Sequence, residues 1–249
     1  MPYSVGLAGK GGTGKTTVAG LLIKYLVEKG KVPVLAVDAD ANSNLNEVLG
    51  LAVEETLGDA REEMKKGVAT GMTKDVFMEM KLEQAVVESK DFDLIVMGRP
   101  EGAGCYCAAN TLLTNYLDRL INNYAYVVMD NEAGMEHISR LTTNNVNLLL
   151  VVSDSTRRGI QAAARIYELT QELGLKIDQK CLIVNLAKDG QEEEIRKRAK
   201  EFGLEVSGIM PEDPLVRQYD LEGKPTTQLS RESRALQAAF AIFDAVLPS

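Results

Sequence analysis

The sequence predicts an α/β fold: a doubly wound, mostly parallel sheet of about seven or eight strands with helices on both faces. Short runs of aliphatic and β-branched residues alternate with longer helical patterns along the chain. Most of the short runs are nearly continuous in apolar residues, as expected for parallel strands covered on both faces. A repeated order of strand, helix and strand implies right-handed crossovers within one sheet.

The expected strands and helices cover most of the chain. The strands are expected at Tyr3–Ala8, Pro33–Val37, Asp93–Met97, Ala125–Met129, Asn147–Val152, Cys181–Asn185 and Glu205–Met210. The helices are expected at Lys15–Lys29, Val53–Lys66, Val76–Ser89, Leu112–Asn122, Arg158–Leu173 and Glu192–Phe202. Neither an internal repeat nor a linker rich in Pro, Gly or Ser divides these elements. Residues 1–249 are therefore expected to form a single domain.

Composition and charge disfavour several classes of partner. The chain has 249 residues, of which 45% are hydrophobic, and 28 Lys and Arg stand against 36 Asp and Glu, for a net charge of −8. This acidic balance, with scattered basic residues, disfavours binding to nucleic acid. No apolar run approaches the roughly 18 residues that cross a bilayer, so no membrane association is expected. The N-terminus lacks the pattern of a secretory signal, which indicates a cytoplasmic protein.

A glycine-rich segment directly follows the first expected strand. Its residues Gly9, Lys10, Gly11, Gly12, Thr13, Gly14, Lys15 and Thr16 match the phosphate-loop pattern G-x-x-x-x-G-K-S/T. Glycines let successive backbone N–H groups point at phosphate oxygens, and the following helix adds the positive end of its dipole. Lys15 is expected to reach the β- and γ-phosphates and the hydroxyl of Thr16 to ligate Mg²⁺, with Thr17 completing the binding residues. The sequence thus predicts an ATPase that uses ATP and Mg²⁺.

The second lysine of this loop, Lys10, is not required by the ordinary phosphate-loop pattern. A cation here can stabilise charge on the transferred phosphoryl group, as an arginine finger does. The spelling K-G-G-x-G-K-T resembles the deviant Walker A motif of the MinD, ParA and nitrogenase iron protein class of ATPases. In that class the early lysine reaches the partner's nucleotide, so the resemblance implies catalytic roles for Lys10 and Lys15 and a homodimer in the ATP state. An exposed loop lysine without such a role is the alternative.

Two carboxylates follow the second expected strand. Asp38 and Asp40 stand two residues apart, so one can act on the Mg²⁺ shell while the other orients the attacking water. The pair matches the D-x-D of the family's switch I, which implies that Asp40 positions or deprotonates water and that Asp38 supports the metal. Ala41 replaces the family's usual proline, which softens switch I but leaves both carboxylates. Two ordinary loop aspartates are the alternative.

Asp130 ends a further expected strand and matches a Walker B carboxylate, which would hold Mg²⁺ through water. A simple cap at the strand end is the alternative for this residue. By the same resemblance, Gly134 matches the glycine of switch II, whose backbone N–H senses the γ-phosphate. His137 is the only histidine and is assigned no role.

Residues after the last two expected strands suit the base of the nucleotide. The resemblance implies that Asn185 reads adenine and that the backbone at Pro211 and Glu212 stacks against the base. An amide can pair with N6 and N7 of adenine, which favours ATP over GTP. The guanine-reading motif N-K-x-D is absent because Leu186 follows Asn185. A strand-end amide and an ordinary proline turn are the alternative.

A pair of cysteines, Cys105 and Cys107, lies in a glycine-containing segment after the strand Asp93–Met97. A C-x-C disulfide is strained, so free thiols are expected. Thiolates select metals such as Zn²⁺, Ni²⁺ and Cu⁺, and two sulfurs leave a four-coordinate metal half satisfied. A symmetric dimer would supply four sulfurs on its two-fold axis. Two unrelated loop cysteines are the alternative, and the remaining Cys181 is expected in the core.

The stretches GRPEGAGCYCAAN and MDNEAGMEH, with the phosphate loop, closely resemble the CooC-type ATPases. Those ATPases mature nickel carbon monoxide dehydrogenase and acetyl-CoA synthase, and the resemblance runs along essentially the whole chain. It implies that ATP hydrolysis assists nickel insertion into a carbon monoxide dehydrogenase/acetyl-CoA synthase client. The sequence leaves open whether Ni²⁺ or Zn²⁺ binds, because a square-planar site suits the first and a tetrahedral sulfur site suits the second.

Two other functions remain open at the level of the sequence. A MinD/ParA-type positioning ATPase would need a membrane-seeking or DNA-binding element. The C-terminal helix instead gathers Leu236, Phe240, Phe243 and Leu247 on one face with few basic residues, which indicates core packing. An ATP-gated iron–sulfur electron donor is the second alternative, but the cluster cysteines of that family are widely separated in sequence.

Overall fold

The computed structural model describes residues 2–40, 44–66, 71–98, 117–131 and 146–248. The strands are β1 Tyr3–Ala8, β2 Val34–Ala39, β3 Val86–Val87, β4 Phe92–Val96, β5 Tyr126–Asn131, β6 Val146–Asp154, β7 Ile177–Ala187 and β8 Val206–Pro211. The helices are α1 Lys15–Glu28, α2 Leu45–Leu49, α3 Leu57–Lys66, α4 Lys74–Gln84, α7 Arg157–Glu172, α8 Glu192–Glu201, α9 Pro214–Leu221, the short 3₁₀ turn Thr226–Gln228 and α10 Arg234–Val246. Residues 117–121 are also helical.

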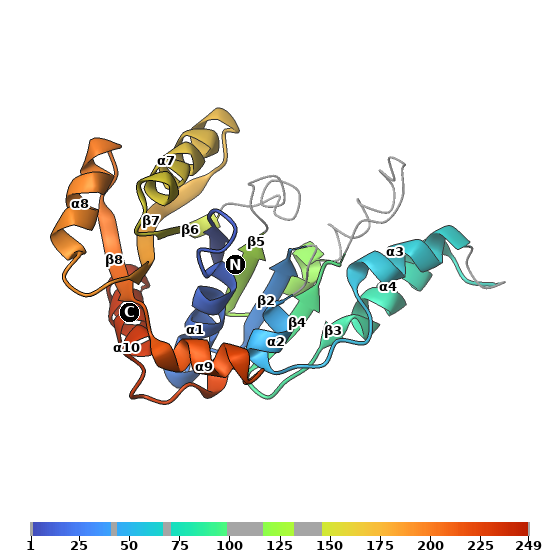
Figure 1. Ribbon diagram of the computed structural model, residues 1–249. Helices are drawn as coiled ribbons and strands as arrows, with labels where there is room; N and C mark the ends of the chain where they lie inside the picture. Colours follow the sequence, from blue (N-terminus) through green and yellow to red (C-terminus); the bar gives the residue numbers. More distant parts are fainter. Residues whose placement is uncertain (1, 41–43, 67–70, 99–116, 132–145, 249) are drawn as a thin grey trace.

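The strands form one eight-stranded sheet in the order β3-β4-β2-β5-β1-β6-β7-β8 (Figure 1). All neighbours pair in parallel except β3, which pairs antiparallel with β4 at one edge. The predicted fold class, a mostly parallel α/β sheet of seven or eight strands, is confirmed. Because β1 lies near the middle, the loop that follows it opens at the centre of the carboxyl edge.

Apolar side chains alternate between the two faces of the sheet and supply two cores. On β6, Leu148 and Leu150 pack toward α1 and α10, whereas Leu149 and Val151 pack toward α7 and α8. Strands buried on both faces explain the nearly continuous apolar runs in the sequence. In Figure 1 the helices accordingly stand on both sides of the strands.

The C-terminal helix and one predicted core residue are placed as the sequence predicts. The C-terminal helix is core packing: Leu236, Phe243 and Leu247 are buried in α10 and just after it, and the Phe240 ring lies 5.2 Å from that of Tyr25. Cys181 is buried and free in β7, as expected.

Other helix boundaries were predicted wrongly. The helix expected over Val53–Lys66 begins only at Leu57, because Thr56 and Asp59 cap its first turn through reciprocal hydrogen bonds. The helix expected over Val76–Ser89 occupies Lys74–Gln84 instead. It stops there because Val86 and Val87 are β-branched and pair with β4 as an edge strand.

Two short helices, α2 and α9, were not predicted from the sequence. Of the helix expected over Leu112–Asn122, residues 117–121 are helical and 112–116 lie outside the described residues. Both missed helices follow strand ends at the carboxyl edge, where short segments carry little periodic signal.

One buried carboxylate, Asp213, joins the two last helices. Its Oδ1 accepts from the backbone N–H of Leu215 at 2.8 Å and so caps α9. Its Oδ2 accepts from the hydroxyl of Ser233 at 2.7 Å and from the N–H of Ala235 at 3.0 Å, at the start of α10. Burial raises the pKa of Asp213, but these hydrogen bonds outweigh burial and leave the pKa below its ordinary value.

Replacing Asp213 by alanine is expected to lower the free energy of unfolding by about 2 kcal/mol, because each lost helix cap costs about 1 kcal/mol. Denaturant titration at neutral pH measures this loss. The lowered pKa means that the carboxylate stabilises the fold above about pH 4 and that this contribution disappears as the pH falls through the folded-state pKa. The difference in the free energy of unfolding between the wild type and Asp213→Ala should therefore decrease at acidic pH.

The exposed Asp220 on the same helix is the matched control. Asp220→Ala is expected to change the free energy of unfolding by no more than about 0.5 kcal/mol. Equal losses in the two variants would contradict the capping role of Asp213.

Candidate functional site

The glycine-rich loop passes through a space that admits no side chain at two points. A Cβ on Gly9, whose φ is +157°, would lie 2.2 Å from the carbonyl oxygen of Val152 on β6. A Cβ on Gly14, whose φ is +82°, would lie 2.4 Å from the side-chain nitrogen of Asn185 on β7. Glycine is therefore required at both positions for the loop to pack against these neighbouring strands.

The polar side chains of this loop are turned back onto its own backbone. Thr13 is buried, and its hydroxyl donates to the carbonyl oxygen of Lys10 at 2.9 Å. The Nζ of Lys15, which is also buried, lies 3.5 Å from the same carbonyl. The side chain of Lys10 is exposed. The ammonium group of Lys15 thus lies against the backbone of the loop, whereas the side chain of Lys10 lies at the surface.

Asp38 and Asp130 lie side by side at the carboxyl ends of β2 and β5. They are register partners in the sheet, and their side chains are 0% and 1% exposed. Asp38 accepts from the backbone N–H groups of Asp40 and Leu45, each at 3.0 Å. Asp130 is hydrogen-bonded to the side chain of Thr16, while its Oδ1 is buried without a hydrogen-bond partner.

Burial raises the pKa of both carboxyl groups to about 6. For Asp38, burial outweighs the two backbone hydrogen bonds, which lower the pKa. For Asp130, burial is the largest cause; the Thr16 hydrogen bond and Lys15 lower the pKa, while Asp38 raises it. A pair of buried carboxylates with one orphaned oxygen would be stabilised by a cation.

The donor set at this point fits Mg²⁺ bound together with phosphates. Oxygen ligands from Thr16 and Asp130, with Asp38 behind them, suit the hard cation. Within the described ranges, no three Cys, His, Asp or Glu side chains gather closely enough to hold a metal alone. Mg²⁺ is usually bound by one or two carboxylates plus substrate phosphates and water, so this sparse set is adequate.

Asp40 and Thr17 also lie at this edge of the sheet. Asp40 is half-buried directly after β2, and its charge acts on that of Asp130. Thr17 is half-buried in the first turn of α1. The structure thus brings Lys15, Thr16 and the three aspartates to one place.

On the other side of the loop, Asn185 is buried at the end of β7. Its side-chain nitrogen donates to the carbonyl oxygen of Thr13 at 2.9 Å. An amide nitrogen has two N–H groups, so a second N–H and the Oδ1 remain for a base. Pro211 pairs with Ala187, and the N–H of Glu212 donates to the carbonyl of Ala187 at 2.9 Å. The predicted adenine residues therefore share one rim, and their contacts with a base stay a prediction.

Several predicted site residues lie outside the described residues, namely Cys105, Cys107 and Gly134. The segment that leads toward the cysteines is nevertheless fixed at its start. The N–H of Met97 donates to the carbonyl of Asp38 at 2.8 Å, and the carbonyl of Met97 accepts from Gly58 at 2.9 Å. The exit of β4 is therefore hydrogen-bonded to Asp38, the residue that is predicted to support the metal.

Sequence reasoning overlooked Asn131, which follows Asp130. It is fully buried, and its side-chain nitrogen donates to the carbonyl of Leu7 at 2.9 Å and to that of Met129 at 3.3 Å. This amide ties the end of β5 to the end of β1, just before the glycine-rich loop. A polar residue directly after an apolar strand was the available signal.

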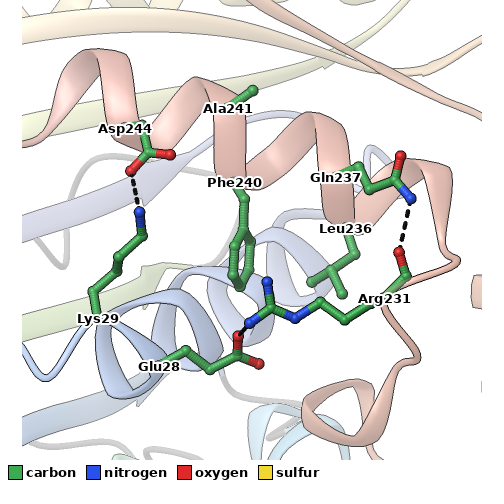
Figure 2. A pocket seen from close by; sticks show the side chains of 8 residues that line it. All are labelled: Glu28, Lys29, Arg231, Leu236, Gln237, Phe240, Ala241 and Asp244. Atoms are coloured by element: carbon green, nitrogen blue, oxygen red, sulfur yellow. Dashed lines mark hydrogen bonds and ion pairs between the residues drawn. The ribbon is translucent and has the colours of Figure 1, made fainter.

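A surface pocket of about 520 Å³ lies far from this edge, between the end of α1 and α10 (Figure 2). Ion pairs flank it: Lys29 and Asp244 at 2.7 Å, and Arg231 with Glu28. Phe240 stands between these pairs in the view. Because its cations are already paired with carboxylates and its residues lie at the opposite end of α1 from Lys15, this pocket is not part of the loop site.

Comparisons with known proteins indicate a family of nucleotide-binding domains. Residues 5–226 match a family profile described as the CobQ/CobB/MinD/ParA nucleotide binding domain. An uncharacterized ATP-binding protein of Methanocaldococcus jannaschii is 42% identical over 248 residues, covering 98% of each chain. The carbon monoxide dehydrogenase accessory protein CooC of Rhodospirillum rubrum is 32% identical over 254 residues, covering 94% of this chain and 95% of that protein.

Solved structures agree on the fold. The septum site-determining protein MinD of Pyrococcus horikoshii, complexed with Mg-ADP, superposes with a TM-score of 0.68 at 24% identity and covers 99% of this chain and 96% of its own. A ParA family ATPase of Chlorobium tepidum superposes with a TM-score of 0.73 at 19% identity, covering 99% of each chain. At these identities the likeness concerns the fold alone.

Replacing Asp130 by asparagine is expected to stabilise the ligand-free protein by about 1–3 kcal/mol at pH 8, because a buried charge is removed. The folded-state pKa is raised to about 6, so the wild-type carboxylate costs stability above that pH. As the pH falls from 6 toward 4, Asp130 of the folded wild type takes up a proton. The difference in the free energy of unfolding between the wild type and Asp130→Asn should then vanish. Denaturant titrations across this range measure the effect.

Asp220→Asn, at an exposed site, is the matched control and should show neither the gain nor its pH dependence. A destabilised Asp130→Asn protein at pH 8 would show that the charge of Asp130 is satisfied without a metal.

Proposed function

The chain belongs to the CobQ/CobB/MinD/ParA family of nucleotide-binding domains, and we propose that it is an ATP-hydrolysing maturation factor for a nickel enzyme. The observation that carries the ATPase half of this proposal is the buried pair Asp38 and Asp130, with one orphaned oxygen beside the phosphate loop. The maturation half rests on the cysteine pair and on the 32% identity to CooC.

In the proposed reaction, the residues at the carboxyl edge hold ATP in place for attack by water. Backbone N–H groups of the loop cradle the phosphates, and Lys15 leaves the Lys10 carbonyl to bind the β- and γ-phosphates. Thr16 and Asp130, with Asp38 behind them, would hold Mg²⁺, which would neutralise negative charge on the phosphates. Asp40 orients the attacking water and accepts its proton.

Lys10 is proposed to contact the nucleotide bound to the partner subunit. Its side chain is exposed, whereas Lys15 is buried against its own loop, so only Lys10 is free to extend outward from the site. A second cation on the γ-phosphate would stabilise the transition state as an arginine finger does. ATP would thereby favour a homodimer, and hydrolysis would release it.

In the proposed dimer, the cysteine pair would also bind a metal. Cys105 and Cys107 of each subunit are proposed to bind one Ni²⁺ or Zn²⁺ through four sulfurs on the two-fold axis. The start of their segment is hydrogen-bonded to Asp38 through Met97, so closure around ATP can reach the metal. The proposed client is a carbon monoxide dehydrogenase/acetyl-CoA synthase, into which the nickel is inserted.

A positioning or partitioning ATPase is the second candidate, because the septum site-determining protein MinD of Bacillus subtilis is 26% identical over 226 residues. Such a protein needs a surface for membrane or DNA. Among the described residues, no helix is long and apolar enough to cross a membrane. The apolar face of α10 is buried against α1, which does not favour this candidate.

Light scattering tests the proposed ATP-dependent homodimer. Asp40→Ala, which is expected to bind Mg·ATP without hydrolysing it, should double its mass in light scattering when Mg·ATP is added, since hydrolysis no longer releases the partner. Adding Lys10→Ala should return the chain to a monomer. Lys197→Ala, an exposed lysine on α8, is the matched control and should leave the dimer intact. If Asp40→Ala stayed monomeric after Mg·ATP was added, this result would contradict the proposed ATP-dependent dimer.

Anaerobic metal titration tests the proposed metal site at the dimer axis. The wild type is expected to bind one metal per two chains, and Cys105→Ser/Cys107→Ser should lose it because the sulfur ligands are gone. Cys181→Ala, which removes the remaining cysteine from the core, should keep the metal. One metal per chain in a monomer would exclude the bridging site. Equal metal affinity without nucleotide, with ADP and with an ATP analogue would exclude the coupling to ATP.

A further inference from the structure

Two helices, α3 and α4, extend beyond one edge of the sheet. They pack on each other, and α4 also contacts the edge strand β3, at the right of the view in Figure 1. The apolar side chains of the pair that the fold buries are Leu57, Ala60, Phe77 and Leu82. Apolar side chains of the same helices that remain exposed are therefore not used in the core.

The first half of α4 carries such exposed side chains. Val76 is 52% exposed, and Met80, one helical turn further on, is partly exposed. Met72 is 36% exposed and directly precedes Thr73, whose hydroxyl caps α4. Among the described residues, no other two exposed large apolar side chains stand within four positions of each other in the sequence. We call Met72, Val76 and Met80 the apolar stripe of α4.

Methionine is concentrated in this region. Four of the nine methionines of the chain lie between Met64 and Met80. A methionine side chain is unbranched and polarizable, so it adapts its shape to a partner and recurs at surfaces that bind other proteins. The composition therefore favours a contact surface over a helix that only faces water.

The surroundings of the stripe are acidic. Residues 53–88 include nine acidic and five basic residues. Glu79 and Glu83 are exposed on α4, each three positions from a residue of the stripe. Lys81 is neutralised by two other glutamates, each 2.9 Å from its Nζ. Such a surface repels anionic lipids and nucleic acid, and it is complementary to a basic protein surface.

The helix pair also contacts both ends of the segment that carries the proposed metal-binding cysteines. At its start, a Cβ on Gly98 would lie 2.4 Å from Oγ1 of Thr56, directly before α3. At its end, Leu117 is buried in the same core cluster as residues of α3 and α4. Arg119 pairs with Glu79 of α4 at 2.9 Å. A protein bound to α4 would therefore lie on the element that holds both ends of this segment.

We propose that the apolar stripe of α4 docks a basic amphipathic helix on the surface of the client enzyme. This inference rests on the proposed function and names the surface through which the client is recognised. The helix would place its apolar residues against the stripe and its lysines or arginines beside Glu79 and Glu83. A second copy of the chain presents the same acidic surface, so its stripe would be repelled.

Two synthetic peptides serve as probes. The basic peptide is a helix of roughly 18 residues with leucines on one face and lysines on the other, and the acidic peptide has glutamates in place of the lysines. Fluorescence anisotropy measures the binding of each peptide to the full-length protein. The wild type should bind the basic peptide and not the acidic one, because only the first is complementary in charge.

Substitutions at Val76 test the apolar contact. Val76→Ser should weaken the binding of the basic peptide about fivefold, whereas Val76→Leu should keep the affinity of the wild type. Leu221→Ser is the matched control, because it removes a side chain that is 77% exposed from another helix, α9. It should leave the affinity unchanged.

A charge reversal tests the acidic rim. Glu83→Lys should weaken the binding of the basic peptide about threefold, because it places a like charge beside the stripe. Glu193→Lys, at an exposed position on α8, makes the same change in net charge and is the control. It should leave the affinity of the wild type nearly unchanged.

Three results would overturn the inference. An equal affinity of Val76→Ser, Leu221→Ser and the wild type for the basic peptide would mean that the stripe makes no contact. Binding to phosphatidylglycerol vesicles that is lost in Val76→Ser would assign the stripe to a lipid surface. Loss of the mass increase with Mg·ATP in Val76→Ser, in the Asp40→Ala background, would assign it to a second copy of the chain.

Further measurements separate this inference from the proposed function. Val76→Ser should hydrolyse ATP and bind metal as the wild type does. A wild type that binds the basic peptide through Val76, but neither hydrolyses ATP nor binds a metal, would leave the docking surface standing and refute the proposed maturation factor. A wild type with both activities whose peptide binding ignores Val76 and Glu83 would refute the docking surface alone.

Discussion

The site depends on one constraint: two carboxylates are buried next to each other at the ends of β2 and β5. Asp38 and Asp130 are register partners in a parallel sheet, so their backbones cannot move apart without breaking the ladder. Their mutual repulsion and lost hydration destabilise the ligand-free protein. The backbone N–H groups of Asp40 and Leu45 offset part of that cost at Asp38, whereas Asp130 keeps an unpartnered oxygen. The missing stabilisation is what a cation with phosphates would supply.

The order of the strands divides the edge of the sheet into two sides around β1. The acidic residues come from β2 and β5 on one side, and Asn185 comes from β7 on the other. Neighbouring strands lie about 4.8 Å apart, so the four steps from β2 to β7 span roughly 19 Å. That width suits an extended nucleotide lying across the loop. Asn185 holds the loop through the carbonyl of Thr13, and Asn131 holds the end of β1, just before the loop, through the carbonyl of Leu7.

Sequence patterns predicted what periodicity and short motifs encode. The sheet, the buried Cys181 and the packing of the C-terminal helix follow from apolar spacing, and the structure confirms them. The roles of Lys10, Asp40 and Asn185, like the single-domain organisation, stay predictions. The end of α4 was misjudged because pairing of Val86 and Val87 with β4 is a long-range event. The positive φ of Leu186, +56°, has no local signature in the sequence either, since the irregularity between Val184 and Ala187 forms only when β7 pairs with β8.

The shared cap at Asp213 has a consequence for how the protein opens. Because one side chain closes the first turns of both α9 and α10, neither helix can fray at its beginning without exposing the other. Helix α10 is anchored in the interior by Phe243, so the lightly packed α9 is tied to a segment with a high opening free energy. Amide protons in the first turn of α9 should then exchange with solvent as slowly as those at the start of α10. The rim beside Pro211 thus takes part in the cooperative unfolding unit of the C-terminal third of the chain.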